Sequence, residues 1–127
     1  MAIATLGVTV LDCPEPRKLA DFYAQVLGGT VEGDREDWVE VHLSPGGRRG
    51  RVLAFQRVPG YVPPRWPSEE HSQQLHLDFD VERERMDAAE REVLALGATL
   101  AQGDDGGKRD FRVYLDPVGH PFCLCVC

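Results

Sequence analysis

Long apolar runs, an excess of positive charge and paired cysteine motifs are all missing from this chain. No apolar stretch approaches the ~20 residues that a helix needs to cross a bilayer, and the amino-terminal residues lack the basic stretch of a secretory signal. We therefore expect a cytoplasmic protein with no membrane partner. The formal net charge of −7 argues against a nucleic-acid partner, because such proteins gain affinity by neutralising phosphates.

The four cysteines are Cys13, Cys123, Cys125 and Cys127, and none forms a Cys-x-x-Cys pair. Zinc-ribbon and thioredoxin-like motifs are therefore excluded. The last three alternate along a predicted strand, where residues two apart point to the same side and their Cα atoms are about 6.7 Å apart. That separation is at the far limit of disulfide geometry, so we predict reduced thiols on one face.

What the chain does contain is an internal repeat. A Leu-Gly-x-Thr piece follows a predicted helix twice, at residues 27–30 and 96–99, with an offset of 69 residues (97 − 28). A repeat of this length in 127 residues predicts one domain, 1–127, built from two similar halves. The first module covers about 1–58, a Pro-rich connection about 59–72, and the second module about 73–127.

Hydrophobic periodicity predicts the same elements in both halves. Apolar stripes at helical spacing predict one helix that begins near Pro14 or Pro16 and ends at Leu27, and another at about 82–96. Alternating or β-branched runs predict strands at 5–12, 30–33, 37–43, 50–58, 74–80, 98–102, 111–116 and 121–126. The predicted fold class is α+β: two tandem βαβββ modules in which curved mixed sheets enclose a cleft, with each helix covering the apolar face of its sheet.

Several polar and aromatic side chains are predicted to face that cleft. Trp38, Glu40 and His42 share one side of a predicted strand, and His76 alternates with the apolar residues of another. We also expect Arg112 and Tyr114 on the cleft side of the strand at 111–116. The connection holds Trp66 among its prolines, and we expect this segment to lie against the body of the protein.

With this pattern, the chain resembles the vicinal oxygen chelate superfamily, which includes glyoxalase I, extradiol dioxygenases and the fosfomycin and bleomycin resistance proteins. The resemblance covers nearly the whole chain and rests on residues 11–16, 20–23, 27–28, 73–79 and 116–122. It implies the glyoxalase-like fold, a homodimer and a small-molecule ligand or substrate. One such fold hosts many chemistries, so the activity must be argued from the site.

The resemblance also implies four inward positions that hold a metal in many members, usually as His, Glu or Gln, His and Glu. In this chain they fall on Val8, Gln56, His76 and Cys123. Val8 has no donor atom, and Cys123 replaces a hard carboxylate with a soft sulfur. We therefore expect no standard metal cofactor. If a divalent metal does bind, the expected ligands are His76, Gln56 and Cys123.

These observations lead to one main hypothesis and three alternatives. The main hypothesis is a binder of a small aromatic or heterocyclic molecule, since aromatic walls with a few polar groups are typical of such pockets. The alternatives are a metal-dependent lyase or dioxygenase-type enzyme with an atypical ligand set, a metal-free isomerase with His76 as catalytic base, and a protein-interaction module. The candidate ligand-binding residues are Trp38, Gln56, Trp66, His76, Arg112, Tyr114 and Cys123.

Overall fold

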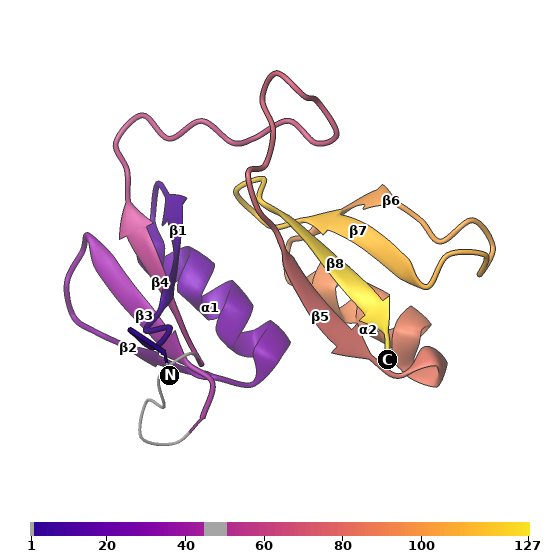
Figure 1. The fold of residues 1–127 in the computed structure, drawn as a ribbon, viewed down its shortest axis with the longest axis horizontal. Helices are drawn as coiled ribbons and strands as arrows, with labels where there is room; N and C mark the ends of the chain where they lie inside the picture. Colours follow the sequence, from indigo (N-terminus) through magenta and orange to yellow (C-terminus); the bar gives the residue numbers. More distant parts are fainter. Residues whose placement is uncertain (1, 45–50) are drawn as a thin grey trace. The chain divides into compact units, whose positions relative to one another are not determined.

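The computed structural model describes residues 2–44 and 51–127, and it forms two compact units, Met1–Tyr61 and Val62–Cys127. The boundary between the units falls inside the predicted Pro-rich connection. Residues 59–72 contain no helix or strand and run as an extended loop (Figure 1). The connection was predicted from its prolines, which disfavour both kinds of regular element.

The first unit is a four-stranded mixed sheet with one helix (Figure 1). The strands stand in the order β1-β4-β3-β2, with β1 parallel to β4 and the other neighbours antiparallel. The predicted strand 50–58 is observed from Val52, and residue 50 lies outside the described residues. The elements are β1 (Thr9–Cys13), α1 (Pro16–Leu27), β2 (Thr30–Glu32), β3 (Trp38–His42) and β4 (Val52–Arg57).

Helix α1 forms where the apolar stripe predicted it. Pro16 occupies the first turn, where its missing N–H costs nothing. Gly28 ends the helix in the left-handed region at φ 75°, and its N–H donates to the Ala24 carbonyl at 2.8 Å. The ring of Tyr23 stacks on Phe55 of β4 with centroids 5.6 Å apart, so α1 and the sheet share one apolar core.

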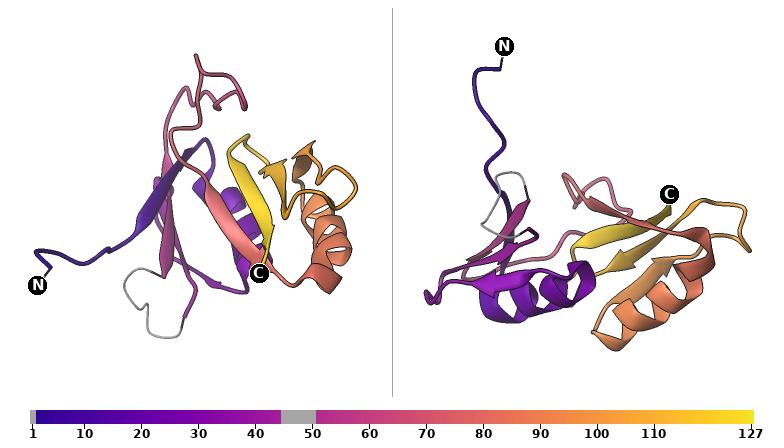
Figure 2. Two further views of the ribbon diagram at one scale, coloured as in Figure 1. Left: turned by 45° about the vertical axis from the view of Figure 1, so that its right-hand side comes forward. Right: turned by 90° about the horizontal axis from the view of Figure 1, so that it is seen from below.

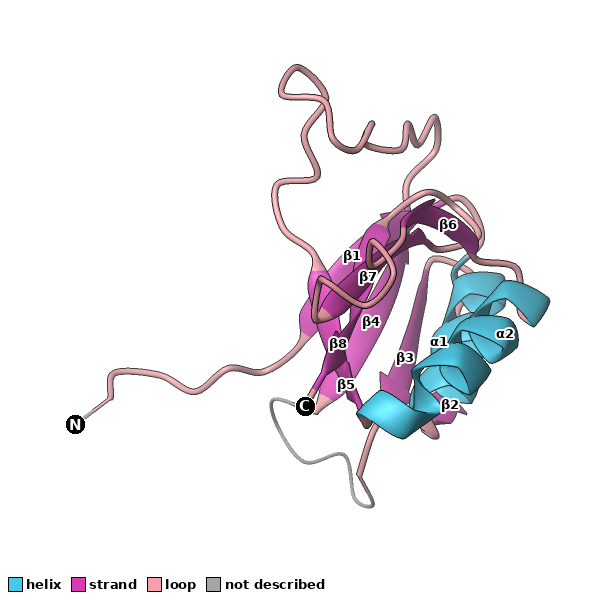
Figure 3. Ribbon diagram, turned by 90° about the vertical axis from the view of Figure 1, so that its right-hand side faces the viewer, coloured by secondary structure: helices cyan, strands magenta, loops and turns pink. Residues whose placement is uncertain are grey.

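The second unit repeats the first. Its strands stand in the order β5-β8-β7-β6, again with one parallel pair, β5 and β8. In each unit the helix lies against one face of the sheet (Figures 2 and 3). The predicted α+β fold of two βαβββ modules with mixed sheets is confirmed. The elements are β5 (Leu77–Val81), η1 (Arg83–Arg85), α2 (Met86–Ala95), β6 (Thr99–Gln102), β7 (Phe111–Leu115) and β8 (Pro121–Val126).

The core of the second unit is centred on Phe122. Its ring centroid is 5.6 Å from that of Phe79 and 5.5 Å from that of Tyr114. Met86 and Val93 of α2 are buried, as the predicted stripe requires. Both units therefore bury an aromatic cluster between helix and sheet.

Two strands begin later than the sequence pattern predicts. Strand β1 begins at Thr9 rather than residue 5, and Thr9 is the first residue with a partner, Leu53 on β4. Strand β5 begins at Leu77, opposite Phe122 of β8. The alternating pattern extends to residues before these two strands, but a strand also needs a neighbour to accept its backbone hydrogen bonds.

No helix in the described part of the chain is long and apolar enough to cross a membrane.

Candidate functional site

Strand register decides which side chains share the open face of the second sheet, the face directed away from α2. Cys123 lies opposite Asp78 on β5 and opposite Val113 on β7. Two residues further along, Cys125 lies opposite Asp80 and Phe111. Neighbours in register point to the same side of a sheet, so two thiols, two carboxylates and two apolar side chains meet on this face.

A cavity of about 430 Å³ lies on this open face. Trp66, Phe111 and Val113 supply apolar wall, and His76 and Asp78 supply polar groups. Cys123, Cys125 and Asp110 complete the lining. The cavity belongs entirely to the second unit, and its composition is that of a small-molecule pocket with few polar groups.

Trp66 reaches the cavity from the Pro-rich connection. The same segment lies close to the β7–β8 turn. A Cβ atom built on Gly119 would be only 2.7 Å from Cβ of Pro63, which is too close for any side chain. Only glycine, with its φ of 97°, permits this approach. The prediction that the connection lies against the body of the protein is therefore confirmed for Pro63 and Trp66.

His76, Asp78 and Cys123 form a compact group beside the cavity. Nε2 of His76 lies 3.1 Å from Oδ1 of Asp78, and one donor atom from each of the three residues lies within 4.8 Å of the others. The histidine and the aspartate are exposed, and the cysteine is buried. The sequence had not singled out Asp78 as a site residue. Its position opposite Cys123 depends on the pairing of β5 with β8.

Both cysteines on this face are neutral thiols at neutral pH. Burial raises the pKa of Cys123 to about 12, and the charge of Asp78 acts in the same direction. Burial and the nearby carboxylates of Asp78 and Asp80 also raise the pKa of Cys125. A reactive cysteine needs a lowered pKa, so neither thiol is an activated nucleophile. No disulfide joins the four cysteines, and the reduced state of Cys123, Cys125 and Cys127 stays a prediction.

The first unit carries a polar cluster on its own open face. Nε1 of Trp38 donates to Glu40 at 3.0 Å, and Glu40 also accepts a hydrogen bond at 2.9 Å from Nε2 of His42 when that nitrogen is protonated. Nδ1 of His42 lies 2.9 Å from Glu32, in an orientation that does not form a hydrogen bond. These residues line a hollow of about 300 Å³ together with Gly33, Asp34 and Arg35. The shared face predicted for Trp38, Glu40 and His42 is confirmed.

Gln56 is exposed and stands in register with Trp38 on β3 and Asp12 on β1. It therefore shares the open face of the first sheet. Val8 precedes β1, and continued alternation puts it on the side of Val10 and Asp12. Gln56 belongs to the first unit and His76 to the second, so their joint role at a ligand stays a prediction.

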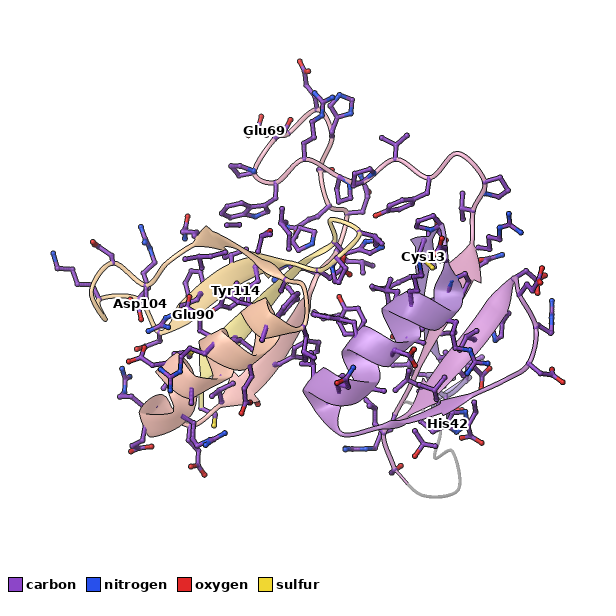
Figure 4. All side chains as sticks on the ribbon, turned by 180° about the vertical axis from the view of Figure 1, so that it is seen from behind. Cys13, His42, Glu69, Glu90, Asp104 and Tyr114 are labelled. Carbon is purple, nitrogen blue, oxygen red and sulfur yellow. The ribbon has the colours of Figure 1, made fainter. Side chains whose placement is uncertain are left out.

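Arg112 and Tyr114 do not face the cavity, and the predicted placement of both on the cleft side is wrong. The guanidinium of Arg112 bonds Asp87, Glu90 and Asp104, each at 2.8 Å. The hydroxyl of Tyr114 donates to Glu90 at 3.2 Å, and Figure 4 shows Tyr114 beside Glu90 of α2. Acidic residues on the helix and in the loop before β7 draw these side chains to the helix side, leaving Phe111 and Val113 on the open face.

The groups of this cluster shift one another's pKa values. Burial acts against the charge of Arg112, but hydrogen bonds to Asp87 and Asp104 and the charge of Glu90 outweigh it and hold its pKa above the usual value. Burial and the charge of Glu90 raise the pKa of Tyr114. The hydrogen bond from Arg112 lowers the pKa of Asp104. The cluster stabilises the contact between α2 and β7, which is a structural role.

Residues 8–125 match the family model of the glyoxalase-like domain. The chain belongs to this family. No curated protein matches it. This family match confirms the resemblance to glyoxalase-like proteins that was stated from the sequence. Solved structures with the same fold include members of the glyoxalase/bleomycin resistance protein/dioxygenase family.

Three of these structures cover almost the entire chain. A glyoxalase/bleomycin resistance/dioxygenase family enzyme from Burkholderia phytofirmans is 17% identical, with a TM-score of 0.69 over 95% of this chain and 97% of that one. The fosfomycin resistance protein FosX from Mesorhizobium loti is 14% identical, with a TM-score of 0.68 over 99% and 94%. A glyoxalase-related enzyme from Fulvimarina pelagi is 18% identical, with a TM-score of 0.70 over 98% and 89%. Similarity at these identities shows the fold alone.

The residues of this chain do not fit the metal centre that the resemblance implies. Val8 offers no donor atom, and Cys123 is a buried thiol where a carboxylate is usual. A hard divalent cation prefers oxygen ligands, and of the four positions only Gln56 offers an oxygen. The standard metal-dependent reactions of the group are therefore not assigned to this glyoxalase-like protein.

Proposed function

We propose that this glyoxalase-like protein binds a small aromatic or heterocyclic molecule in the cavity on the open face of the second sheet, without the standard metal centre. The observation that carries the proposal is the cavity itself. Its volume of about 430 Å³ falls in the usual range for small-ligand pockets, roughly 300–1,000 Å³. Its walls are largely apolar, so the ligand gains affinity by leaving water.

The polar groups of the cavity give the bound molecule an orientation. Trp66 and Phe111 offer aromatic surface, while His76 and Asp78 offer a donor and an acceptor. A ring with one polar substituent matches this arrangement of aromatic walls and a polar end. Trp38 and Gln56 stay predicted ligand contacts from the first unit, whereas Arg112 and Tyr114 contribute by holding β7 against α2.

A second candidate function is a metal-free isomerase with His76 as general base. The observation that favours it is the contact between His76 Nε2 and Asp78 Oδ1 at 3.1 Å. A carboxylate at one ring nitrogen orients the imidazole and leaves the other ring nitrogen to accept a proton from a bound molecule. The base would stand at the wall of the cavity, within reach of a bound molecule.

A binding screen in the presence of a chelator tests both functions. Aromatic and heterocyclic compounds are titrated into untagged protein and followed by tryptophan fluorescence and calorimetry. We expect one compound per chain and at least ~10-fold weaker binding in Trp66→Ala and Phe111→Ala, because an aromatic pair contributes about 0.5–1.5 kcal/mol beyond the apolar area that it buries. Leu100→Ala is the matched control, since Leu100 is exposed on β6 and does not line the cavity.

The fate of the bound compound separates the two candidates. A compound released unchanged supports the binding function. A rearranged product that forms with the wild type but not with His76→Gln supports the isomerase. The absence of binding in the wild type, or equal binding in Phe111→Ala and Trp66→Ala, contradicts the proposed pocket.

A further inference from the structure

The polar end of the cavity combines three different metal-binding side chains. His76 and Asp78 lie two residues apart along the chain, and Asp78 stands directly opposite Cys123 in the pairing of β5 with β8. The paired strands fix the positions of Asp78 and Cys123, and His76 immediately precedes β5. The donor atoms of all three residues are within 4.8 Å of one another.

The chemistry of this donor set differs from that of the standard centre. Imidazole, carboxylate and thiolate together suit Zn²⁺, which takes nitrogen, oxygen and sulfur ligands in a tetrahedron. With bonds of about 2.0–2.3 Å, ligand atoms in such a site are about 3.3–3.8 Å apart. The donor atoms of this group all lie within 4.8 Å of one another, and His76 Nε2 and Asp78 Oδ1 are 3.1 Å apart, which is close to that spacing. Three protein ligands leave one position for an atom of the molecule in the cavity.

We propose that His76, Asp78 and Cys123 form a binding site for a borderline-soft divalent ion of the zinc type, held entirely within the second unit. Asp78 takes part in this site, and Gln56 of the first unit does not. The site shares its cavity with the proposed organic ligand, but it does not depend on that ligand. One alternative from the sequence was a metal-dependent enzyme with an atypical ligand set. The proposed site names the ligands of that set and the class of metal that they would bind.

Cobalt substitution is the experiment that tests the site. Untagged protein is stripped with a chelator, dialysed, and titrated with Zn²⁺ or with Co²⁺. We expect one equivalent of metal and, with cobalt, the near-ultraviolet absorption that a thiolate–cobalt bond produces. Zinc should also raise the Tm, because an ion that binds only the folded state stabilises it. Neither readout requires a known activity.

Matched variants assign the ligands. Cys123→Ser should abolish the absorption band, and Asp78→Asn and His76→Ala should weaken zinc binding at least ~10-fold. Cys125→Ser and Gln56→Ala should keep both the band and the affinity, since Cys125 lines the same cavity but is outside the group of three. Circular dichroism confirms that each variant is folded.

Several outcomes would overturn the assignment. They are no metal uptake by the wild type, a band that persists in Cys123→Ser, and a band lost in Cys125→Ser or Gln56→Ala. The proposed function is measured with a chelator present. Failure of the metal site therefore leaves the organic-ligand result unchanged, and failure of the ligand screen leaves the metal titration unchanged.

Discussion

Burial sets the chemistry of Cys123 more than its neighbours along the sequence do. Only 8% of this residue is exposed, and the thiolate would lie beside the carboxylate of Asp78. Both effects favour the neutral thiol, with a pKa of about 12. The residue therefore serves as a small apolar wall of the cavity at neutral pH, and it acts as an anion only when a cation replaces its proton.

The raised pKa of Cys123 predicts a loss of stability in alkali. An unfolded thiol ionises near 9.0, whereas the folded one ionises at about 12. Between these values the folded protein binds more protons than the unfolded chain, so the free energy of unfolding falls as pH rises. Metal-free Cys123→Ala should lose less stability than the wild type between pH 8 and 11, measured by urea unfolding.

The contribution of Tyr114 is common to both proteins in that comparison and cancels. Cys127→Ala, an exposed position at the end of the chain, is the control and should follow the wild type. Parallel stability curves for the wild type and Cys123→Ala would show that the folded thiol is not perturbed as described.

At the scale of elements, a charge cluster joins helix α2 to strand β7. The Arg112 side chain is 12% exposed and meets Glu90, which is 23% exposed, and Asp104, which is 21% exposed. Removal of the cation would leave partly buried carboxylates next to one another. Removing one partner of a buried ion pair lowers the free energy of unfolding by more than the pair itself contributes, because the remaining charge is left without a partner.

Arg112→Met should therefore destabilise the protein by about 3 kcal/mol, measured by chemical denaturation at neutral pH. Arg35→Met is the matched control, since the Arg35–Asp37 pair is 67% and 61% exposed and surface pairs contribute little. The double variant Arg112→Met, Glu90→Gln should recover part of the loss. An effect of Arg112→Met no larger than that of Arg35→Met would contradict the structural role of the cluster.

At the scale of the whole molecule, the same strand order occurs twice. Each unit buries an aromatic core between helix and sheet and leaves an open face that carries polar groups. The two open faces differ in chemistry: the first carries a Glu–His–Trp cluster, and the second carries thiols and a cavity. Repetition of the fold has therefore not repeated the site.

The homodimer also belongs to this scale, and it stays a prediction from the family. Sedimentation velocity on untagged protein should show a species of twice 14.1 kDa. A dilution series is the control, because a dimer dissociates by mass action. A single species of 14.1 kDa at every concentration would contradict the prediction.

The sequence by itself determined the repeat, the order of elements and the carboxyl end of α1. These features are local: helical stripes, alternation and the glycine at residue 28 act over a few residues. The polar stripe of β3 was also predictable, because Val39 and Val41 are buried and alternate with Trp38, Glu40 and His42.

Tertiary structure alone decided which side of β7 faces the cavity and which residues stand together there. Phe111-Arg112-Val113-Tyr114 alternates two apolar residues with an Arg and a Tyr, so the pattern permits either orientation. Glu90 of α2 and Asp104 of the loop before β7 bind Arg112 and thereby select one of the two orientations. Asp78 meets Cys123 only through a strand pairing that spans 45 residues (123 − 78), and local periodicity carries no information about such contacts.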